Sequence, residues 1–196
     1  MTGEQFETAQ AGGPRDRQSV AMAAIVIRPA RMDDVPAITE IQNALIATTA
    51  IEWRDEPHTV DDRVAWLREQ EANGFPVHVA DHDGEVVGFT AFGDFRDTTK
   101  WPGYWTTVEH SIHVRRDHWG GGVGRMLVDS IAEVARRQGR HVLVAAVDGE
   151  NEASLRFHEQ LGFREVARMP EVGVKFGKWL DLVLLALRLD ERPSPT

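Results

Sequence analysis

The chain has 196 residues, of which 42% are hydrophobic and 27% are charged, and its formal net charge is −9. This composition is typical of one globular domain with a full core and argues against general disorder. The acidic balance disfavours nucleic acid as a partner, and the absence of cysteine excludes disulfides, cysteine-ligated zinc and thiol nucleophiles.

The ends of the chain differ from its middle. Residues 1–23 are polar and aperiodic, which predicts a flexible N-terminal tail, and residues 191–196 predict a short C-terminal tail around a single domain over residues 24–190. We find no run of about 18 apolar residues and no basic start followed by an apolar core. We therefore expect a soluble, cytoplasmic protein with no membrane partner.

The first third of the domain predicts one strand and two helices. Residues 25–28 are apolar enough for a short strand, and residues 33–36 (Asp-Asp-Val-Pro) begin a helix with an acidic cap and an early proline. Thr59 and Asp62 have the spacing of a capping box for the second helix.

The rest of the domain alternates between strands and helices. Strands are expected at residues 77–80 and 85–92, joined by a hairpin turn over residues 81–84 (Asp-His-Asp-Gly), and at residues 106–114. A helix to residue 138, a strand at 141–147, a helix after 151 and strands at 163–169 and 180–189 complete the order. This order predicts an α/β (α+β) fold with a mixed sheet and helices on both faces.

A glycine-rich turn lies between the strand at residues 108–114 and the helix that follows. Glycines that leave backbone N–H groups free at the start of a helix are typical of a diphosphate site, and Arg125 adds a positive charge. The alternative is a loop that only needs a positive φ. A dinucleotide site is disfavoured because no acidic residue ends a strand about 20 residues later. The glycines are Gly120, Gly121, Gly122 and Gly124.

Glu109 lies inside the strand at residues 106–114. With a period of two, Glu109, Ser111 and His113 share one face of this strand. A carboxylate inside a sheet costs free energy unless it is paired or used, and one use is as a general base that removes a proton from a bound substrate. The alternative is a solvent-facing or salt-bridged glutamate on an edge strand.

With the glycine turn, its two flanking strands and the segment from Asn151 to His158 in register, the chain resembles the GNAT superfamily of acetyl-CoA-dependent N-acetyltransferases over residues 25–190. More narrowly, it resembles the phosphinothricin and methionine sulfoximine N-acetyltransferases. Residues 107–111 (Thr-Val-Glu-His-Ser) and residues 169–181 carry that narrower similarity.

The resemblance implies a cofactor site and catalytic roles. It implies a GNAT fold in which two strands splay apart, Glu109 acts as the general base, and the N–H near Ile112 polarises the acetyl carbonyl. His158 stands where many relatives have a tyrosine that protonates the departing thiolate; a purely structural histidine is the alternative. Trp119 departs from the usual Gln or Arg, so we expect altered cofactor binding. The residues implied in acetyl-CoA binding are Ser111, Ile112, His113, Val114, Trp119, Gly120, Gly121, Gly122, Val123, Gly124, Arg125, Asn151 and Ser154.

Substrate selection is expected from an aromatic and basic segment after the strand at residues 85–92. Arg96 is a candidate for the α-carboxylate of an amino acid, with Phe95 and Trp101 beside it, and we expect this segment near the glycine turn. The alternative is an aromatic loop that packs over the sheet edge. Lys175 is expected from the partner subunit of a homodimer. The histidines show no spacing typical of a metal site, so none is predicted.

These observations together predict an enzyme that moves the acetyl group of acetyl-CoA to the α-amine of a small amino-acid-like substrate by direct attack in a ternary complex. Phosphinothricin, methionine sulfoximine and methionine sulfone are the acceptors that the resemblance implies. The alternatives are acetylation of a polyamine or a protein N-terminus, and a non-catalytic acyl-CoA-binding sensor.

Overall fold

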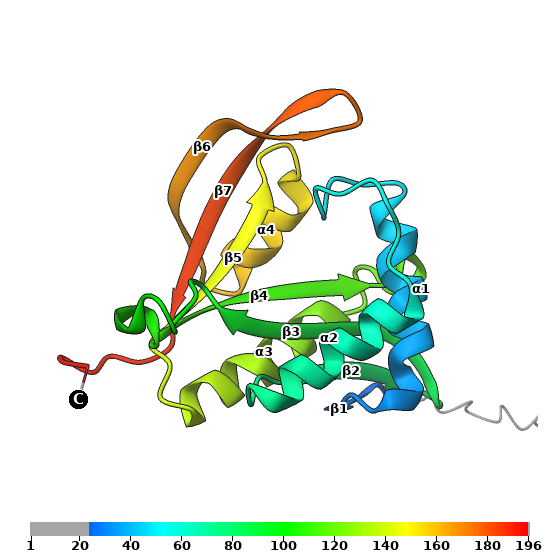
Figure 1. Cartoon of the computed structure of the whole chain (residues 1–196), viewed down its shortest axis with the longest axis horizontal. Coiled ribbons are helices and arrows are strands. Elements are labelled where there is room, and N and C mark those ends of the chain that lie inside the picture. The colour runs from blue at the N-terminus through cyan, green and yellow to red at the C-terminus, as the bar shows by residue number, and fades with distance from the viewer. Residues whose placement is uncertain (1–23, 196) are drawn as a thin grey trace, which may run out of the picture.

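The computed structural model describes residues 24–195, so the N-terminal tail predicted for residues 1–23 lies outside the described residues. One seven-stranded sheet in the order β1-β2-β3-β4-β5-β7-β6 forms the centre of the molecule. Every neighbouring pair of strands is antiparallel except β4 and β5, which are parallel. The predicted mixed α/β sheet is thereby confirmed (Figure 1).

The elements follow the predicted order. The strands are β1 (Val26–Pro29), β2 (Val77–His82), β3 (Glu85–Asp94), β4 (Thr107–Val114), β5 (Val142–Asp148), β6 (Arg164–Lys175) and β7 (Lys178–Arg188). The helices are α1 (Val35–Ile46), α2 (Val60–Ala72), α3 (Val123–Arg137) and α4 (Glu152–Gln160). Short 3-10 turns lie at Met32–Asp34, Pro102–Tyr104 and Arg116–His118.

The capping box at Thr59 and the hairpin turn between β2 and β3 form as predicted. At the start of α2 the Thr59 side chain accepts a hydrogen bond from the Asp62 N–H, and the Asp62 carboxylate accepts one from the Thr59 N–H. The turn between β2 and β3 places Asp83 at φ 56° and Gly84 at φ 84°. Two successive positive φ angles suit the right-handed twist of the flanking strands, so this turn fixes the hairpin register.

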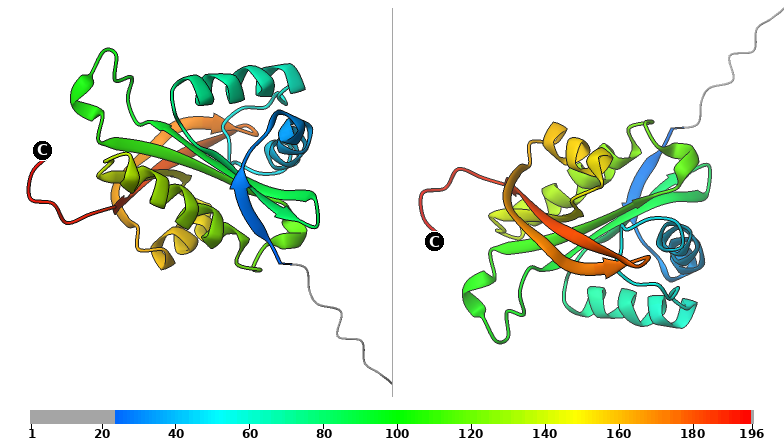
Figure 2. Two further views of the ribbon diagram at one scale, coloured as in Figure 1. Left: turned by 90° about the horizontal axis from the view of Figure 1, so that it is seen from below. Right: turned by 90° about the horizontal axis from the view of Figure 1, so that it is seen from above.

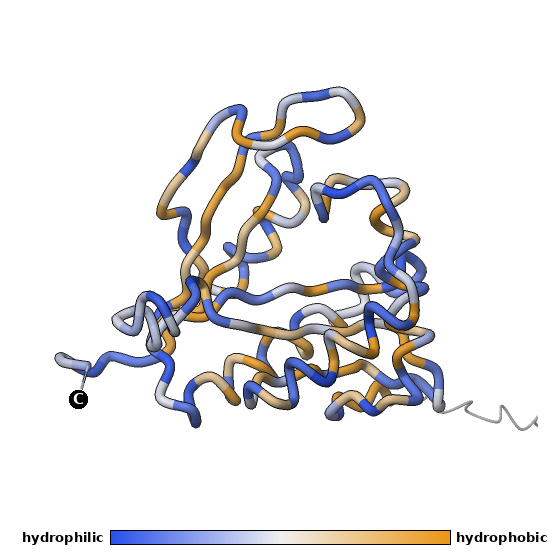
Figure 3. The backbone as a smooth tube through the Cα atoms, viewed as in Figure 1, coloured by the Kyte–Doolittle hydropathy of each residue, from blue (hydrophilic) through white to orange (hydrophobic). Residues whose placement is uncertain are grey.

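The helices cover both faces of the sheet. Figure 2 shows α1 and α2 on one side and α3 with α4 on the other. Val128, Ile131 and Leu143 belong to the core on the α3 side, while Ile38 and Phe89 belong to the core on the α1 side. In Figure 3 the hydrophobic stretches of the strands and helices accordingly meet at the sheet.

The only parallel pair in the described sheet opens partway along its length. Thr107 pairs with Val142, and the pairing continues to His110 and Ala145, where it stops. Both strands continue beyond that point, β4 to Val114 and β5 to Asp148. Beyond the last pair the backbone of β4 has no ladder partner on this side, so the splay that the resemblance implied is confirmed.

The C-terminal hairpin is longer than predicted. We expected strands that ended at residue 169 and began at 180, with a loop between them, but β6 and β7 turn only at Phe176 and Gly177. A register shift between Met169 and Gly173 absorbs the irregular residues, so the ladder continues past Pro170. Beyond β7, the Arg192 guanidinium donates to the Gly139 carbonyl at 2.6 Å, which ties the start of the predicted tail to the domain.

Candidate active site

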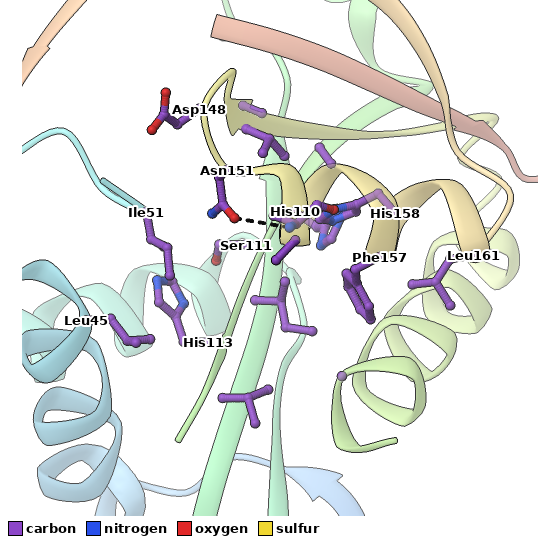
Figure 4. Close-up of a pocket in the computed structure, with 18 of the residues that line it drawn as sticks. Leu45, Ile51, His110, Ser111, His113, Asp148, Asn151, Phe157, His158 and Leu161 are labelled. Atoms are coloured by element: carbon purple, nitrogen blue, oxygen red, sulfur yellow. Dashed lines mark hydrogen bonds between the residues drawn. The ribbon is translucent and has the colours of Figure 1, made fainter. Parts of the chain in front are cut away.

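A cavity of about 900 Å³ occupies the splay between β4 and β5. Figure 4 shows its side chains converging from α1, β4 and α4. The glycine loop closes one end, and the segment between α1 and α2 closes another. Residues from four separate parts of the chain line it: Leu45, Ile51, Glu52, Trp53, Glu109 to Val114, His118, Trp119, Gly120, Gly122, Gly124, Arg125, Ala145 to Asp148, Asn151, Ala153, Ser154, Phe157, His158, Gln160, Leu161 and Leu182.

The glycine loop presents the N-terminus of α3 to this cavity. Gly120 and Gly122 have φ angles of 75° and 83°, so both need glycine for the backbone alone. Gly124 has a different reason, because a Cβ there would lie 3.1 Å from the Phe157 ring. The first intrahelical hydrogen bond of α3 runs from the Met126 N–H to the Gly122 carbonyl at 3.2 Å. The Gly121 N–H is used by the His118 carbonyl at 3.4 Å, whereas the N–H groups of Gly122, Val123 and Gly124 are available to an anion.

Trp119 and Arg125 flank this loop and have partners of their own. The Trp119 indole N–H donates to the Val114 carbonyl at 2.7 Å, and the Arg116 guanidinium lies 5.4 Å from the centre of its ring. The tryptophan therefore caps the end of β4. Arg125 donates to the Gln160 carbonyl at 3.0 Å, at the end of α4, while still lining the cavity.

Glu109 enters the cavity from β4. It is half-buried and has no hydrogen-bond or ion-pair partner among the residues that the structure describes. Burial raises the pKa of its carboxyl above the ordinary value because the charged form loses water. Its strand neighbour Val108 packs in the core on the α3 side, and His113 stacks on Phe89 on the α1 side. The predicted sharing of one face by Glu109 and His113 is confirmed.

His110 and His158 form a buried pair on the opposite face of β4, with ring centres 5.2 Å apart. Burial lowers the pKa of His158, and burial together with the nearby His158 lowers the pKa of His110 to about 3. Both rings are therefore neutral at pH 7. His158 Nδ1 lies 2.8 Å from the Ser154 carbonyl, which assigns the ring proton to Nδ1 and leaves Nε2 as an acceptor without a partner in the described chain.

Asn151 begins α4. Its side-chain oxygen accepts a hydrogen bond from the Ser154 N–H at 3.1 Å, which caps the helix, and both residues line the cavity. The Ser154 carbonyl then fixes His158 one turn later. The start of α4 therefore positions the histidine at the cavity wall.

A polar cluster that we did not predict lies on the α1 side of the cavity. We call Glu52, Gln42, His58 and His113 the Glu52 cluster. Glu52 Oε1 accepts a short hydrogen bond from Gln42 Nε2 and lies 3.0 Å from His113 Nε2, while Oε2 lies 3.3 Å from His58 Nε2. Burial opposes ionisation, but the hydrogen bonds from His113 and Gln42 outweigh it and lower the pKa of Glu52 to about 2.

The C-terminal hairpin holds the segment that carries Glu52. Lys175 is 1% exposed, and its ammonium donates to the Ile46 and Glu52 carbonyls at 2.8 and 2.6 Å. A Cβ on Gly173 would lie 2.1 Å from the Trp53 ring, so the indole lies directly against the hairpin backbone. The expectation that Lys175 reaches the site of a partner subunit is corrected: its donors are used on carbonyls of its own chain.

The segment around Arg96 lies elsewhere. β3 runs antiparallel to β4, and Asp94 pairs with Val108, so residues that follow β3 lie at the start of β4. The glycine loop follows the end of β4, about 23 Å away at 3.3 Å per residue. Our expectation that Arg96 lies near that loop is therefore wrong. Arg96, Phe95 and Trp101 do not line the cavity of the described chain; Arg96 and Trp101 are exposed, and the Arg96 guanidinium lies about 6 Å from the Phe95 and Tyr104 rings.

The described residues contain neither a cluster of side chains placed to bind a metal ion nor a helix suited to cross a membrane. No group of three or more His, Asp or Glu side chains within residues 24–195 is placed to hold a metal ion. In the same part of the chain, no helix is both long and apolar enough to cross a membrane.

Comparison with known proteins gives consistent results. The chain is 45% identical over 169 residues to the L-amino acid N-acyltransferase MnaT of Escherichia coli (strain K12), covering 86% of this chain and 96% of that protein. It is 44% identical over 171 residues to the L-methionine sulfoximine/L-methionine sulfone acetyltransferase of Salmonella typhimurium, covering 87% and 98%.

A solved structure of a Salmonella typhimurium acetyltransferase with its cofactor acetyl-CoA superposes with a TM-score of 0.83 at 44% identity, covering 88% of this chain and 98% of that one. The sequence pattern of the Acetyltransferase (GNAT) family matches residues 38–163, which is more than half of the chain. The predicted resemblance is confirmed: the chain belongs to the GNAT family of acetyltransferases.

Proposed function

We propose that this protein transfers the acetyl group of acetyl-CoA to the α-amine of an amino acid of the methionine sulfoximine or methionine sulfone type. The observation that carries the proposal is Glu109, a half-buried carboxylate without a partner among the described residues, beside the point where β4 and β5 separate. The relatives named for L-amino acids and for methionine sulfoximine and sulfone support the acceptor class.

The described residues fit acetyl-CoA. The free N–H groups at the start of α3 suit the diphosphate, and the unpaired backbone of β4 beyond His110 suits the amide-containing pantetheine arm. The buried Nε2 of His158, which has no partner in residues 24–195, suits a thiol. Trp119, Arg125, Asn151 and Ser154 would border the bound molecule.

In the proposed reaction Glu109 removes one proton from the substrate ammonium, directly or through a water molecule, and passes it to solvent. The freed amine then forms a C–N bond to the acetyl carbon while the C–S bond breaks. The N–H near Ile112 stabilises the oxygen that becomes negative. The second proton of the amine goes to the departing sulfur.

His158 has a narrower role than the proton donor of the initial hypothesis. Its proton is on Nδ1 and is used by the Ser154 carbonyl, so Nε2 accepts a hydrogen bond from the thiol product. It lies on the face of β4 opposite to Glu109. The amine would therefore meet Glu109 on one side of the strand, and the sulfur would meet His158 on the other.

We further propose that the protein is a homodimer that forms through the C-terminal hairpin. β6 is an edge strand, and apolar side chains on the hairpin are exposed: Val166, Met169, Val172, Val174, Phe176 and Trp179. Figure 3 shows hydrophobic stretches along this hairpin. Exposed apolar surface of this kind is typical of an interface. We expect Trp179→Glu to convert a dimer to a monomer in analytical ultracentrifugation.

Arg96 remains our candidate for the substrate carboxylate, approached from the Thr107 end of β4. Its guanidinium has no ion-pair partner among the described residues. We expect Arg96→Ala to raise KM for the amino acid and to leave the affinity for acetyl-CoA unchanged, with Arg68→Ala, at an exposed position of α2, as a control.

The experiment that tests the proposed function is thiol release from acetyl-CoA with a panel of acceptors. The panel contains methionine sulfoximine, methionine sulfone, phosphinothricin, plain amino acids, spermidine and a short peptide. Turnover of the amino-acid members supports the proposal. Turnover of spermidine or the peptide alone would reject the acceptor class, and binding of acetyl-CoA without any turnover would reject the reaction.

A further inference from the structure

Glu52 is the only acidic side chain of the segment between α1 and α2 that lines the described cavity. Gln42, His58 and His113 hold its carboxylate, and the Lys175 ammonium holds its backbone carbonyl. Its pKa near 2 means that it is ionised throughout the physiological range. The cavity therefore has a fixed negative charge in a fixed position.

The proton positions around Glu52 follow from the contacts. Burial lowers the pKa of His58, so this ring is neutral, and Arg54 Nη1 lies 2.8 Å from its Nδ1. An arginine can only donate, so His58 Nδ1 accepts and Nε2 carries the proton that faces Glu52. Arg63 donates to the Gln42 carbonyl oxygen at 3.0 Å, which turns the amide so that its NH₂ faces Glu52.

These partners leave one position on the carboxylate open. A carboxylate has about four acceptor positions. Oε1 is used by Gln42 and His113, whereas Oε2 has only His58. Arg54, Arg63 and Lys175 lie behind the cluster, since none of these three cations lines the described cavity. A ligand group that reaches Glu52 from the cavity therefore meets a carboxylate that can only accept.

The position of Glu52 matches the length of the proposed substrate. Glu52 pairs with His113, which lies two residues beyond Ser111 and roughly 7 Å further along β4. An amine held near Glu109 and Ser111 would direct a methionine-like side chain toward Glu52. The five bonds from the amine to the sulfoximine nitrogen span about 6 Å when extended.

We propose that Glu52 is a specificity-determining residue that selects acceptors whose side-chain head donates a hydrogen bond, and that the enzyme therefore prefers methionine sulfoximine to methionine sulfone. This inference rests on the proposed function. The two heads have nearly the same shape, but the sulfoximine has an N–H where the sulfone has a second oxygen. The N–H donates to the Glu52 carboxylate, whereas a sulfone oxygen is repelled. The anionic phosphinate of phosphinothricin is repelled more strongly.

The test compares kcat/KM for the three acceptors in the full-length wild type, in Glu52→Gln and in Glu56→Gln. Glu56 lies in the same segment, is exposed and does not line the cavity, so its variant removes the same charge without the contact. We expect the wild type and Glu56→Gln to prefer the sulfoximine by roughly tenfold or more. In Glu52→Gln the side-chain amide can donate to the sulfone. The ratio of kcat/KM for the sulfoximine to kcat/KM for the sulfone should therefore fall to about one or below. Phosphinothricin turnover should rise roughly tenfold or more.

Other outcomes separate this inference from the proposed function. A wild-type ratio near one would overturn the inference without any variant. A Glu52→Gln variant that loses activity equally on all acceptors, with an unchanged ratio, would show that Glu52 only supports the fold of its segment. Turnover of amino acids in either case leaves the proposed function standing, whereas failure of the wild type on every amino acid overturns both.

Discussion

The two walls of the cavity are built from different parts of the chain. On the α3 side the wall consists largely of backbone: the glycine loop, the start of α3 and the unpaired edge of β4, all within consecutive residues. On the α1 side it consists of side chains from α1, the segment before α2 and β4, and Lys175 of the C-terminal hairpin supports them from behind. Backbone groups can bind acetyl-CoA, which is the same in every reaction, with few demands on which side chains are present. Side chains from distant segments can differ between enzymes that use different acceptors.

Substitution of Glu109 should have the largest effect on turnover, because this residue is the proposed base and lies between the two walls. We expect Glu109→Gln to lower kcat by about 10²- to 10³-fold and to leave the Kd for acetyl-CoA unchanged. Burial raises the pKa of Glu109, and only its deprotonated form is a base. The kcat/KM of the wild type should therefore rise with pH through that raised pKa, and this limb should disappear in the variant. Glu71→Gln, an exposed residue of α2, is the control, and wild-type turnover in Glu109→Gln would rule out this base.

Lys175→Met tests whether the hairpin supports the acceptor wall. Methionine keeps the apolar length of lysine but leaves the buried carbonyls of Ile46 and Glu52 without their donor. We expect the free energy of unfolding to fall by about 2–3 kcal/mol and KM for the amino acid to rise, with the Kd for acetyl-CoA unchanged. Lys178→Met, on the exposed part of the same hairpin, is the control in chemical denaturation. A variant that weakened acetyl-CoA binding instead would mean that the two walls are not independent.

Gly122→Ala and Gly121→Ala form a matched pair for the backbone wall. Gly122 has a φ of 83°, whereas Gly121 has no positive φ, and a Cβ at Gly121 would make an ordinary contact at 3.4 Å. A left-handed alanine costs about 1–2 kcal/mol, so Gly122→Ala should either weaken acetyl-CoA binding by about 5- to 30-fold or lower the free energy of unfolding by about 1–2 kcal/mol. Gly121→Ala should do less. Calorimetric titration with acetyl-CoA and a melting curve measure both, and equal effects would contradict the assignment.

Trp119→Arg should have the smallest effect. The tryptophan caps β4 through the Val114 carbonyl and leaves the loop amides free, so its replacement adds a cation beside the expected diphosphate. We expect acetyl-CoA to bind a few-fold more tightly at low salt and the gain to disappear at high salt. Unchanged or weaker binding would show that the indole itself contributes to the site.

The sequence predicted the backbone wall far better than the side-chain wall. Strands, the capping box at Thr59 and the glycine loop depend on residues close together in the chain, so their patterns are local. The Glu52 cluster joins residues as far apart as Gln42 and His113, and each is unremarkable in its own segment. The one available signal was a charge between two apolar residues, Ile51 and Trp53.

Two errors have simple topological causes. Arg96 was expected near the glycine loop, although a strand antiparallel to β4 must end where β4 begins. The hairpin was expected to contain a loop between residues 169 and 180, a stretch that includes Pro170, Gly173 and Gly177. In the structure Gly173 and Pro170 lie in a bulged edge strand, and only Gly177 lies in the turn.

The contact between Trp53 and Gly173 limits how this enzyme can be redesigned. Because the indole occupies the space of any side chain at position 173, a library that varies that position alone should yield only inactive or misfolded proteins. A smaller residue at position 53 would release position 173, so the two positions should be randomised together. Natural relatives that accept bulkier amino acids are expected to show paired changes at these two places, a pattern that an alignment could test without any enzyme in hand.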